Sequence, residues 1–283
     1  MIADCWCALP MEQRARLAPF YSSFNPTDIA AVEHLRRLYA KYPGMWRGIG
    51  EVMCRHDDLT TLLQEKETPT PNHPGLKPVY EFCVEKDLAI MIHSNSDYVA
   101  DKDSFWEYLF EMEEVLNTFP TLKLIWAHAG VSRRVSAPGH HEMIERMVQR
   151  HPNLMIDISW VVWEDVICDS SGEPLQAWVD MCERNSTRIM IGSDQVGQFV
   201  GVNGENWLKP EITKYWKLFD RLSEEAAENI ARANAEKMFF SNWKVPTFAE
   251  LPQTKPVYPC ECLLMTQGLF QQMTDTTGAA LNF

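Results

Sequence analysis

The sequence has no excess of positive charge. Its 26 Lys and Arg residues stand against 39 Asp and Glu residues, which gives a formal net charge of −13. Binding to nucleic acid or to an anionic membrane surface depends on a basic face, so neither is expected as a partner. No apolar run reaches the ~20 residues that cross a bilayer, and residues 1–10 lack the basic start and apolar core of a signal peptide. We therefore expect a cytoplasmic protein.

The cysteines also lack a clear metal-binding pattern. The sequence contains 8 cysteines and no Cys-x-x-Cys motif. Two Cys-x-Cys pairs, Cys5/Cys7 and Cys260/Cys262, match no standard zinc signature and are weak candidates for a metal site. Other cysteines lie in apolar, helix-like segments. We therefore expect buried, reduced thiols, as in a cytosolic protein.

Three apolar stretches end in side chains that can bind metal. LKLIWAHAG ends its apolar run at His128, LAIMIHSN ends at His93, and RIMIGSDQ ends at Asp194. A short apolar run between helix breakers predicts a strand buried on both faces of a parallel sheet. The carboxyl ends of such strands are where α/β proteins place their chemistry. Each residue alone could be an ordinary loop residue, but together the two imidazoles and the carboxylate predict a metal site.

Strands and helices alternate along most of the chain. A spacing of about 30 residues is typical of βαβ units and predicts an α/β fold with a parallel sheet. Right-handed crossovers then leave either an open sheet or a closed barrel. The expected strands are Leu17–Phe24, Met45–Met53, Ala89–His93, Leu122–His128, Asn153–Ser159 and Arg188–Ser193. The expected helices are Ile29–Lys41, Leu76–Lys86, Ser104–Thr118, His141–Arg150, Leu175–Asn185 and Glu224–Phe240.

A change in composition separates the end of the chain from the rest. Residues 1–246 carry the alternating pattern and are expected to form the folded domain. Residues 247–283 begin Pro-rich, have weak periodicity and are expected to be a C-terminal tail. Within the domain, Leu59–Gly75 is a long segment without periodicity, which makes it a candidate lid over a site.

The motifs YPGMWRGIGEV, PVYEFCVEKDLAIMIHSN, LKLIWAHAG, PNLMIDIS, RIMIGSD and ENIARANAEKMF follow one another along the chain. In this order they resemble the amidohydrolase superfamily, in the branch of aminocarboxymuconate semialdehyde decarboxylase and related metal-dependent enzymes. The resemblance implies a (β/α)8, TIM-barrel-like fold with one divalent metal, usually zinc, at its carboxyl face. It implies that His93 is a metal ligand and that His128 assists catalysis. It also implies that Asp194 touches the metal and handles the proton of the bound water.

The chain departs from this family in one feature. Members begin with a strand that carries His-x-His and supplies two metal ligands, and this sequence has no His-x-His. With about six βα units where a closed barrel has eight, the barrel is expected to be incomplete at its N-terminus. The first two units would lie upstream of Met1 or be lost. Zinc sites need three or four protein ligands, so binding through His93 and Asp194 alone should be weak. The open sheet edges favour self-association into a homo-oligomer.

Several further residues near the strand ends are candidates for the site. Glu51 could add a carboxylate ligand, or it could pair with a neighbouring arginine. Arg55 and Arg133 lie in loops on the same expected face, where arginine suits bidentate binding of a substrate carboxylate. His56 is a candidate for a further metal ligand or for a substrate-binding residue. Trp160 could wall an apolar substrate pocket or pack in the core.

Three functions remain open at this point. The first is an enzyme, a metal-dependent hydrolase that cleaves an amide, ester or lactone bond of a small carboxylated molecule. The second is a non-oxidative decarboxylase that uses the same metal with His128 and Asp194. The third is a shortened, catalytically impaired barrel that serves as a binding or assembly partner. The two enzymes would differ only in contacts of the substrate pocket.

Overall fold

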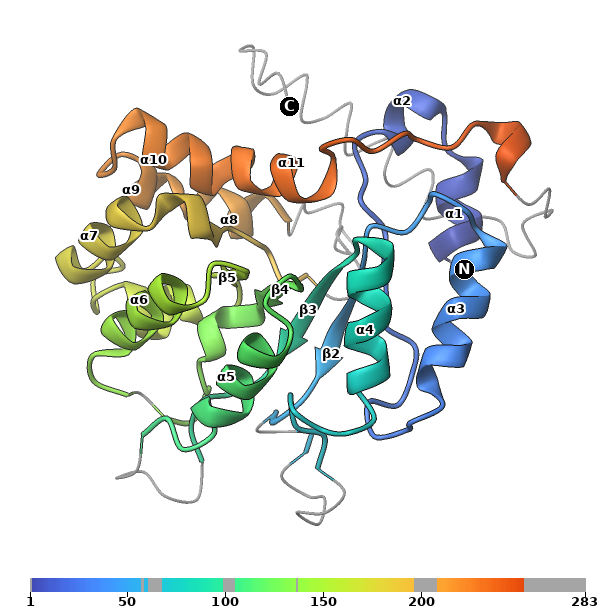
Figure 1. Cartoon of the computed structure of the whole chain (residues 1–283). Helices are drawn as coiled ribbons and strands as arrows, with labels where there is room; N and C mark the ends of the chain where they lie inside the picture. The colour runs from blue at the N-terminus through green and yellow to red at the C-terminus, as the bar shows by residue number, and fades with distance from the viewer. Residues whose placement is uncertain are drawn as a thin grey trace.

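The computed structural model has a parallel sheet at its centre (Figure 1). It describes residues 2–56, 59–60, 68–98, 105–135, 137–195 and 208–251. Within this part of the chain, six strands lie side by side in their sequence order, and each runs parallel to the next. The strands are β1 (Phe20–Tyr21), β2 (Gly48–Met53), β3 (Ala89–His93), β4 (Lys123–Trp126), β5 (Leu154–Asp157) and β6 (Ile189–Met190).

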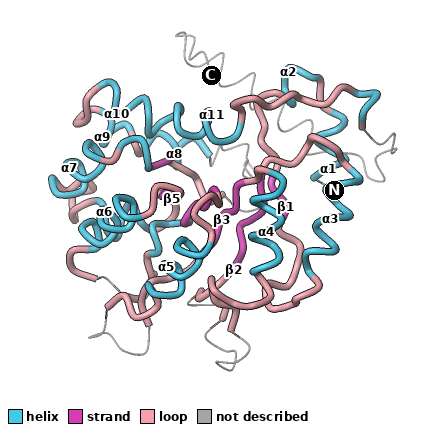
Figure 2. Tube along the Cα trace, viewed as in Figure 1, coloured by secondary structure: helices cyan, strands magenta, loops and turns pink. Residues whose placement is uncertain are grey.

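The helices that connect successive strands cover one face of the sheet (Figure 2). The helices of the described residues alternate with the strands over most of the chain. They are α1 (Ile2–Ala8), α2 (Met11–Arg14), α3 (Ala31–Lys41), α4 (Lys77–Lys86), α5 (Leu109–Thr118), α6 (His140–Arg150), α7 (Gln176–Arg184), α8 (Leu208–Thr213), α9 (Trp216–Phe219), α10 (Glu224–Glu228) and α11 (Asn234–Phe239). On the covered face, Ile90, Leu124 and Ile156 belong to one core with the apolar residues of α4, α5 and α6. Alternate residues of a strand point to opposite faces. The remaining strand residues therefore point to the other face of the sheet, where a different element packs on them.

The observed topology confirms the predicted α/β fold. The predicted strands at Ala89, Leu122, Asn153 and Arg188 are neighbours in that order, and β1 and β6 are the two edges. Six parallel strands in the described residues are two fewer than a closed (β/α)8 barrel has. The arrangement is therefore TIM-barrel-like and incomplete. The edge strands are the ones whose predicted lengths were most excessive, because they have a partner on one side only.

The face of the sheet opposite to α4, α5 and α6 is called the inner face here. It is covered by the end of the last long helical segment. Here α10, the π-helical turn Asn229–Ala233 and α11 follow one another directly, as predicted for Glu224–Phe240. Ser223 caps the start, because its hydroxyl oxygen accepts from the amide of Ala226 at 3.2 Å. At the other end, Met238 and Phe239 pack against a small apolar cluster on the strands. That cluster consists of Ala89, Ile125, Met155 and Met190.

This helical segment connects the two edges of the open sheet. The Asn234 amide donates to the Ile189 carbonyl of β6 at 2.8 Å. Five residues later, the ring of Phe239 meets Phe20 of β1 edge-on, with centroids 5.4 Å apart. The Phe239 carbonyl accepts from the guanidinium of Arg47 at 2.7 Å. A helix thus covers part of the edges that a closed barrel would pair with further strands.

The cysteines agree with the predicted reduced thiols except at one position. Five of the described cysteines are free and buried, whereas Cys5 is disulfide-bonded. Cys260 and Cys262 lie outside the described residues, as do residues 252–283 of the predicted tail and residues 61–67 of the candidate lid. Among the helices of the described ranges, none is long and apolar enough to cross a membrane.

Candidate metal centre

Glu51 reaches the inner face of the sheet through a bulge in β2. The register with β3 shifts between Ile49 and Val52, so both of these residues face the helix-covered core. The extra residue between them turns Glu51 towards the opposite face. Gly50 permits this path: its φ is +131°, and a Cβ atom there would lie 2.5 Å from the carbonyl oxygen of Met91. An even alternation of residues along β2 would have buried Glu51 among the helices.

Three further polar side chains lie at the carboxyl ends of neighbouring strands. His93 is the last residue of β3. His128 follows β4 in the 3-10 turn Ala127–Gly130, where its φ of 55° takes the chain out of the strand earlier than predicted. Asp194 follows β6 and also has a positive φ, 48°. The predicted strands were too long here, but the polar residues reach the predicted edge.

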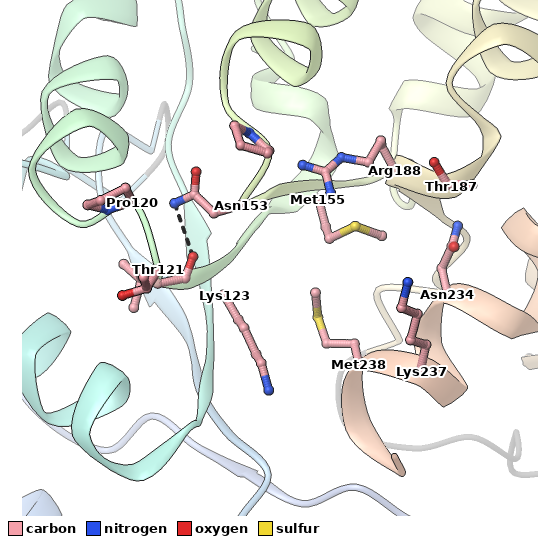
Figure 3. Close-up of a pocket in the computed structure, with 12 residues that line it drawn as sticks. Pro120, Thr121, Lys123, Asn153, Met155, Thr187, Arg188, Asn234, Lys237 and Met238 are labelled. Carbon is pink, nitrogen blue, oxygen red and sulfur yellow. Dashed lines mark hydrogen bonds between the residues drawn. The ribbon is translucent and has the colours of Figure 1, made fainter. Parts of the chain in front are cut away.

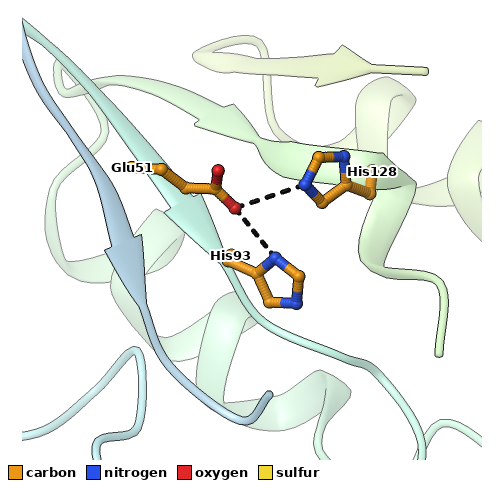
Figure 4. Close-up of side chains that lie close together, drawn as sticks. All are labelled: Glu51, His93 and His128. Atoms are coloured by element: carbon orange, nitrogen blue, oxygen red, sulfur yellow. Dashed lines mark hydrogen bonds and ion pairs between the residues drawn. The ribbon is translucent and has the colours of Figure 1, made fainter. Parts of the chain in front are cut away.

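Glu51 lies between the two histidines (Figure 4). Its Oε1 atom is 2.8 Å from Nδ1 of His93 and 3.3 Å from Nε2 of His128. The same Nε2 atom of His128 is also 3.9 Å from Oδ1 of Asp194. Both histidines are almost fully buried, with exposed fractions of 2% and 3%. The rings of His93 and His128 thus lie close together, with centroids 5.1 Å apart, and Asp194 lies beside His128.

The cluster shifts the pKa values of its own members. Burial alone would raise the pKa of Glu51, but the hydrogen bonds to His128 and His93 outweigh it and lower that pKa to about 2. Burial would likewise lower the pKa of His128, but hydrogen bonds to Asp157 and Glu51 raise it to about 10. Burial raises the pKa of Asp194, partly opposed by the charge of His128. Without a metal, a carboxylate and an imidazolium thus stabilise each other, and Asp194 is the carboxylate that takes up a proton most readily.

The second nitrogen of His128 is held by β5 and the residues after it. Nδ1 is 2.9 Å from Oγ of Ser159, whose hydroxyl donates to Oδ2 of Asp157 at 2.5 Å. Because the hydroxyl proton is used there, Oγ accepts from Nδ1–H of His128. Nε2 is therefore the atom left to face Glu51. Asp157 has a structural hydrogen-bonding role, because it also accepts from the backbone amide of His128 at 3.2 Å. Ser159 was not identified, although its spacing from Asp157 in NLMIDIS places both on one side of the chain.

His93 is oriented from both sides of its ring. Its Nε2 atom is 3.2 Å from Oδ1 of Asn95, a residue that the sequence analysis did not single out. The ring of His56 lies over His93, with centroids 4.4 Å apart and planes at 30°. His56 thus belongs to the neighbourhood of the cluster, as predicted from its position, although its ring nitrogens are not among the grouped ligand atoms of the described residues.

Trp160 forms a wall beside the two histidines. Its ring centroid is 5.0 Å from that of His128 and 5.8 Å from that of His93. The guanidinium of Arg133 lies over the Trp160 ring at 4.6 Å, and this arginine is exposed. An aromatic wall with a cation on it, next to buried imidazoles, can receive an anionic ligand.

Arg55 has a different setting from Arg133. Its guanidinium forms two hydrogen bonds with the carboxylate of Glu111 on α5, at 3.1 and 2.6 Å. It also lies 3.9 Å from the centroid of the Tyr108 ring. Both partners of the ion pair are buried, with 8% and 3% of their side chains exposed. These contacts explain Arg55 as a residue that ties the end of β2 to α5. Its role in substrate binding stays a prediction.

The donor set at the strand ends fits a divalent metal. Ligand atoms of Glu51, His93 and His128 all lie within 4.8 Å of one another. Two imidazoles with one carboxylate match a common ligand set of catalytic zinc, and Asp194 stands beside them as a further oxygen donor. Hydrogen bonds from a second layer, such as that between His128 and Ser159, are what orient histidine ligands in such sites.

Solved structures share this fold at low sequence identity. A dihydroorotase from Campylobacter jejuni superposes with a TM-score of 0.50 and 16% identity, covering 78% of this chain and 64% of that chain. A zinc-bound amidohydrolase from Burkholderia multivorans has a TM-score of 0.49 and 12% identity, covering 80% and 75%. An uncharacterised TIM-barrel protein from Bordetella bronchiseptica has a TM-score of 0.48 and 15% identity, covering 81% and 72%. This chain therefore spans less than two thirds of the dihydroorotase.

The sequence itself identifies the family. No curated protein matches the chain. A family model described as amidohydrolase matches residues 28–240, which is most of the chain and includes every residue of the cluster. The match starts before Glu51 and ends at the last helix over the inner face of the sheet. The chain belongs to the amidohydrolase family.

Proposed function

We propose that the chain is a metal-dependent hydrolase that cleaves an amide, ester or lactone bond of a small carboxylated molecule. The observation that carries the proposal is the convergence of Glu51, His93, His128 and Asp194 at the carboxyl ends of four strands. Membership of the amidohydrolase family supports a metal-dependent reaction at that edge. Zinc is the ion we propose, because the histidines and carboxylates are its usual ligands.

Glu51, His93 and His128 would hold the ion. A divalent ion bound there polarises a substrate carbonyl and lowers the pKa of water towards neutrality. Glu51 takes the place of an imidazole ligand from the absent His-x-His motif. Ser159 and Asp157 keep the imidazole of His128 in the orientation that presents Nε2 to the site.

Asp194 is the residue we assign to proton transfer. Burial raises its pKa, so its carboxylate accepts a proton more readily than an exposed aspartate. Its Oδ1 atom lies 3.9 Å from Nε2 of His128, which places the carboxylate next to the proposed metal ligands. Removal of the carboxylate would leave the proton of the attacking water without an acceptor.

Trp160 and Arg133 are the residues we assign to substrate binding. The flat face of Trp160 borders the histidines, and the exposed guanidinium of Arg133 above it suits a carboxylate of the substrate. His56 borders the same space from the side of His93. A carboxylate on the substrate would be bound while its scissile bond lies over the metal ligands.

The test is a hydrolysis assay of the zinc-loaded protein with lactones and N-acyl amino acids that carry a free carboxylate. We expect turnover that falls by about 100-fold or more in Asp194→Asn, as for other general acid–base residues, with zinc content retained. Arg133→Ala should raise KM for the acids but not for their methyl esters, with Arg134→Ala as the matched control. Release of CO2 from aromatic acids, with no hydrolysis, would replace the proposal by a decarboxylase.

A further inference from the structure

A cavity lies at the opposite end of the sheet from the metal ligands (Figure 3). It has a volume of about 370 Å³, is open to solvent, and is lined on one side by residues at the start of β4, β5 and β6. Its other wall is α11, the helix that covers the inner face of the sheet. Cavities of this size and larger hold small-molecule ligands in proteins. None of the proposed metal ligands or substrate-binding residues lines it.

The lining of this cavity is cationic. Lys123, Arg188 and Lys237 each contribute to it, and no Asp or Glu does. This contrasts with a chain whose net charge is −13. Lys123 forms its ion pair with Asp87, whose side chain is 79% exposed, so that pair is weak. Three cations from separate elements around one cavity create a local positive potential.

Arg188 is the most confined of the three cations. One of its nitrogens donates to the carbonyl of His151 at 3.0 Å. Burial lowers the pKa of its guanidinium, which means that the charge has lost part of its hydration. An anion in the cavity would replace that hydration with charge-assisted hydrogen bonds. Lys237 is exposed at the rim and can close over such a ligand without leaving its helix.

Asn153 adds an acceptor to the same cavity. Its Nδ2 atom donates to the carbonyls of Phe119 and Leu122, at 3.0 and 3.1 Å. These two bonds fix the orientation of the amide. Its Oδ1 atom is buried and has no hydrogen-bond partner among the described residues. A buried acceptor without a donor costs stability, and a hydroxyl or amino group of a ligand would satisfy it.

The floor of the cavity is apolar. Met155 of β5 and Met238 of α11 face each other between the cations (Figure 3). A bare inorganic ion would leave this floor without contacts. A short carbon skeleton that carries both an anionic group and a donor would contact the methionines, the cations and Asn153 at once.

We propose that this cavity binds a small hydroxylated organic anion at a second site distinct from the metal centre. The anionic group of this ligand is a phosphate monoester or a carboxylate. Binding in this cavity is independent of the hydrolase activity proposed for the metal centre. It rests on the three cations, the unsatisfied amide oxygen of Asn153 and the methionine floor.

The experiment is calorimetric titration of the full chain with glycerol 3-phosphate, which has a phosphate and hydroxyl donors. We expect saturable binding at one site. Lys237→Gln and Arg188→Gln should each weaken it by about tenfold or more, the effect of losing one charge-assisted hydrogen bond. Lys77→Gln is the matched control, because Lys77 is exposed at the far end of α4 and the charge change is the same. Its affinity should equal that of the unmodified chain.

Sulfate is the second probe, because it has the charge but no hydroxyl group. We expect it to bind more weakly than glycerol 3-phosphate. Equal affinities would overturn the role of Asn153. Absence of saturable binding, or affinities that are the same in Lys237→Gln and Lys77→Gln, would overturn the site. Lys237→Gln keeps this test decisive even if the half-buried Arg188 proves necessary for folding.

Discussion

His128 is the residue whose chemistry depends most on its neighbours. Glu51 and Asp157 lie on opposite sides of its ring and raise its pKa from 6.5 to about 10. In the metal-free protein it is therefore protonated at neutral pH, and a metal ion must displace that proton to bind there. Metal affinity should accordingly rise with pH.

The same shift makes folding stability depend on pH. The pKa of His128 is higher in the folded protein than in the unfolded chain, so its contribution is complete below pH 6.5 and is lost as the pH rises towards 10. Asp157→Asn removes one of the two carboxylates and should lower the pKa of His128, which flattens the loss between these pH values. Urea unfolding of metal-free protein and an NMR titration of the imidazole measure both effects. Asp180→Asn, an exposed change elsewhere, should alter neither, and a pKa near 6.5 in the unmodified chain would contradict the prediction.

The buried ion pair of Arg55 and Glu111 gives a second prediction at this scale. Glu111→Gln keeps the shape of the side chain but leaves the charge of Arg55 buried without its carboxylate. We expect a loss of about 3 kcal/mol in the free energy of unfolding, as found when one partner of a buried pair is removed. Urea denaturation measures it. Glu85→Gln, in the exposed pair with Arg36, is the control and should change stability little; equal effects in the two variants would be inconsistent with a structural role of the buried pair.

At the scale of elements, the turn after β4 determines where His128 points. Gly130 in this turn has a φ of +65°, and a Cβ atom would lie 2.2 Å from the Trp126 ring. Gly130→Ala should therefore cost about 2–4 kcal/mol of stability, from backbone strain and overpacking together, and should reduce metal binding by moving His128. Gly44→Ala is the control, because its φ is also positive but the nearest atom is 3.6 Å away. Thermal unfolding and the metal content of each variant measure these effects. Equal stability and equal metal content in Gly130→Ala and Gly44→Ala would contradict the prediction.

Much of the element order could be predicted from the sequence, because buried parallel strands read as apolar runs between breakers. β3 has the predicted bounds, and His93 ends it as expected. What could not be predicted is where backbone departs from regular geometry. The bulge that turns Glu51 inwards depends on a register shift against β3, and the turn at His128 depends on packing against Trp126. The partner of Arg55 was missed for a related reason. Glu111 is 56 residues away in the sequence, and no sequence pattern indicates that the two side chains meet.

At the scale of the whole molecule, we expect the covering helix to protect the edges of the open sheet from pairing with another chain. The sequence analysis expects self-association through exposed edges, and the structure places α11 between those edges. Phe239→Asp would put a charge against Phe20 and detach the end of this helix. We expect a higher and more concentration-dependent mass by light scattering than for the unmodified chain, because the edge strands lose their cover. Lys244→Asp, an exposed change after α11, should leave the mass unchanged; identical masses in all three proteins would argue against the edge-covering role.

The central claim is that Glu51, His93 and His128 hold one metal ion, with Asp194 beside them, although the His-x-His motif is absent. Counting from the sequence, His93 and Asp194 alone would bind zinc weakly. In the structure, Glu51, His93 and His128 instead bring three ligand atoms within 4.8 Å of one another, which leads to the opposite expectation.

The most direct test is the zinc content of the chain after loading and gel filtration, measured by mass spectrometry of the metal. We expect about one zinc per chain, the stoichiometry of a mononuclear site, and little zinc in Glu51→Gln or His93→Ala. His34→Ala, on α3 and away from the cluster, should retain the full amount. A chain that emerges without zinc, or Glu51→Gln and His93→Ala variants that keep it, would contradict the account.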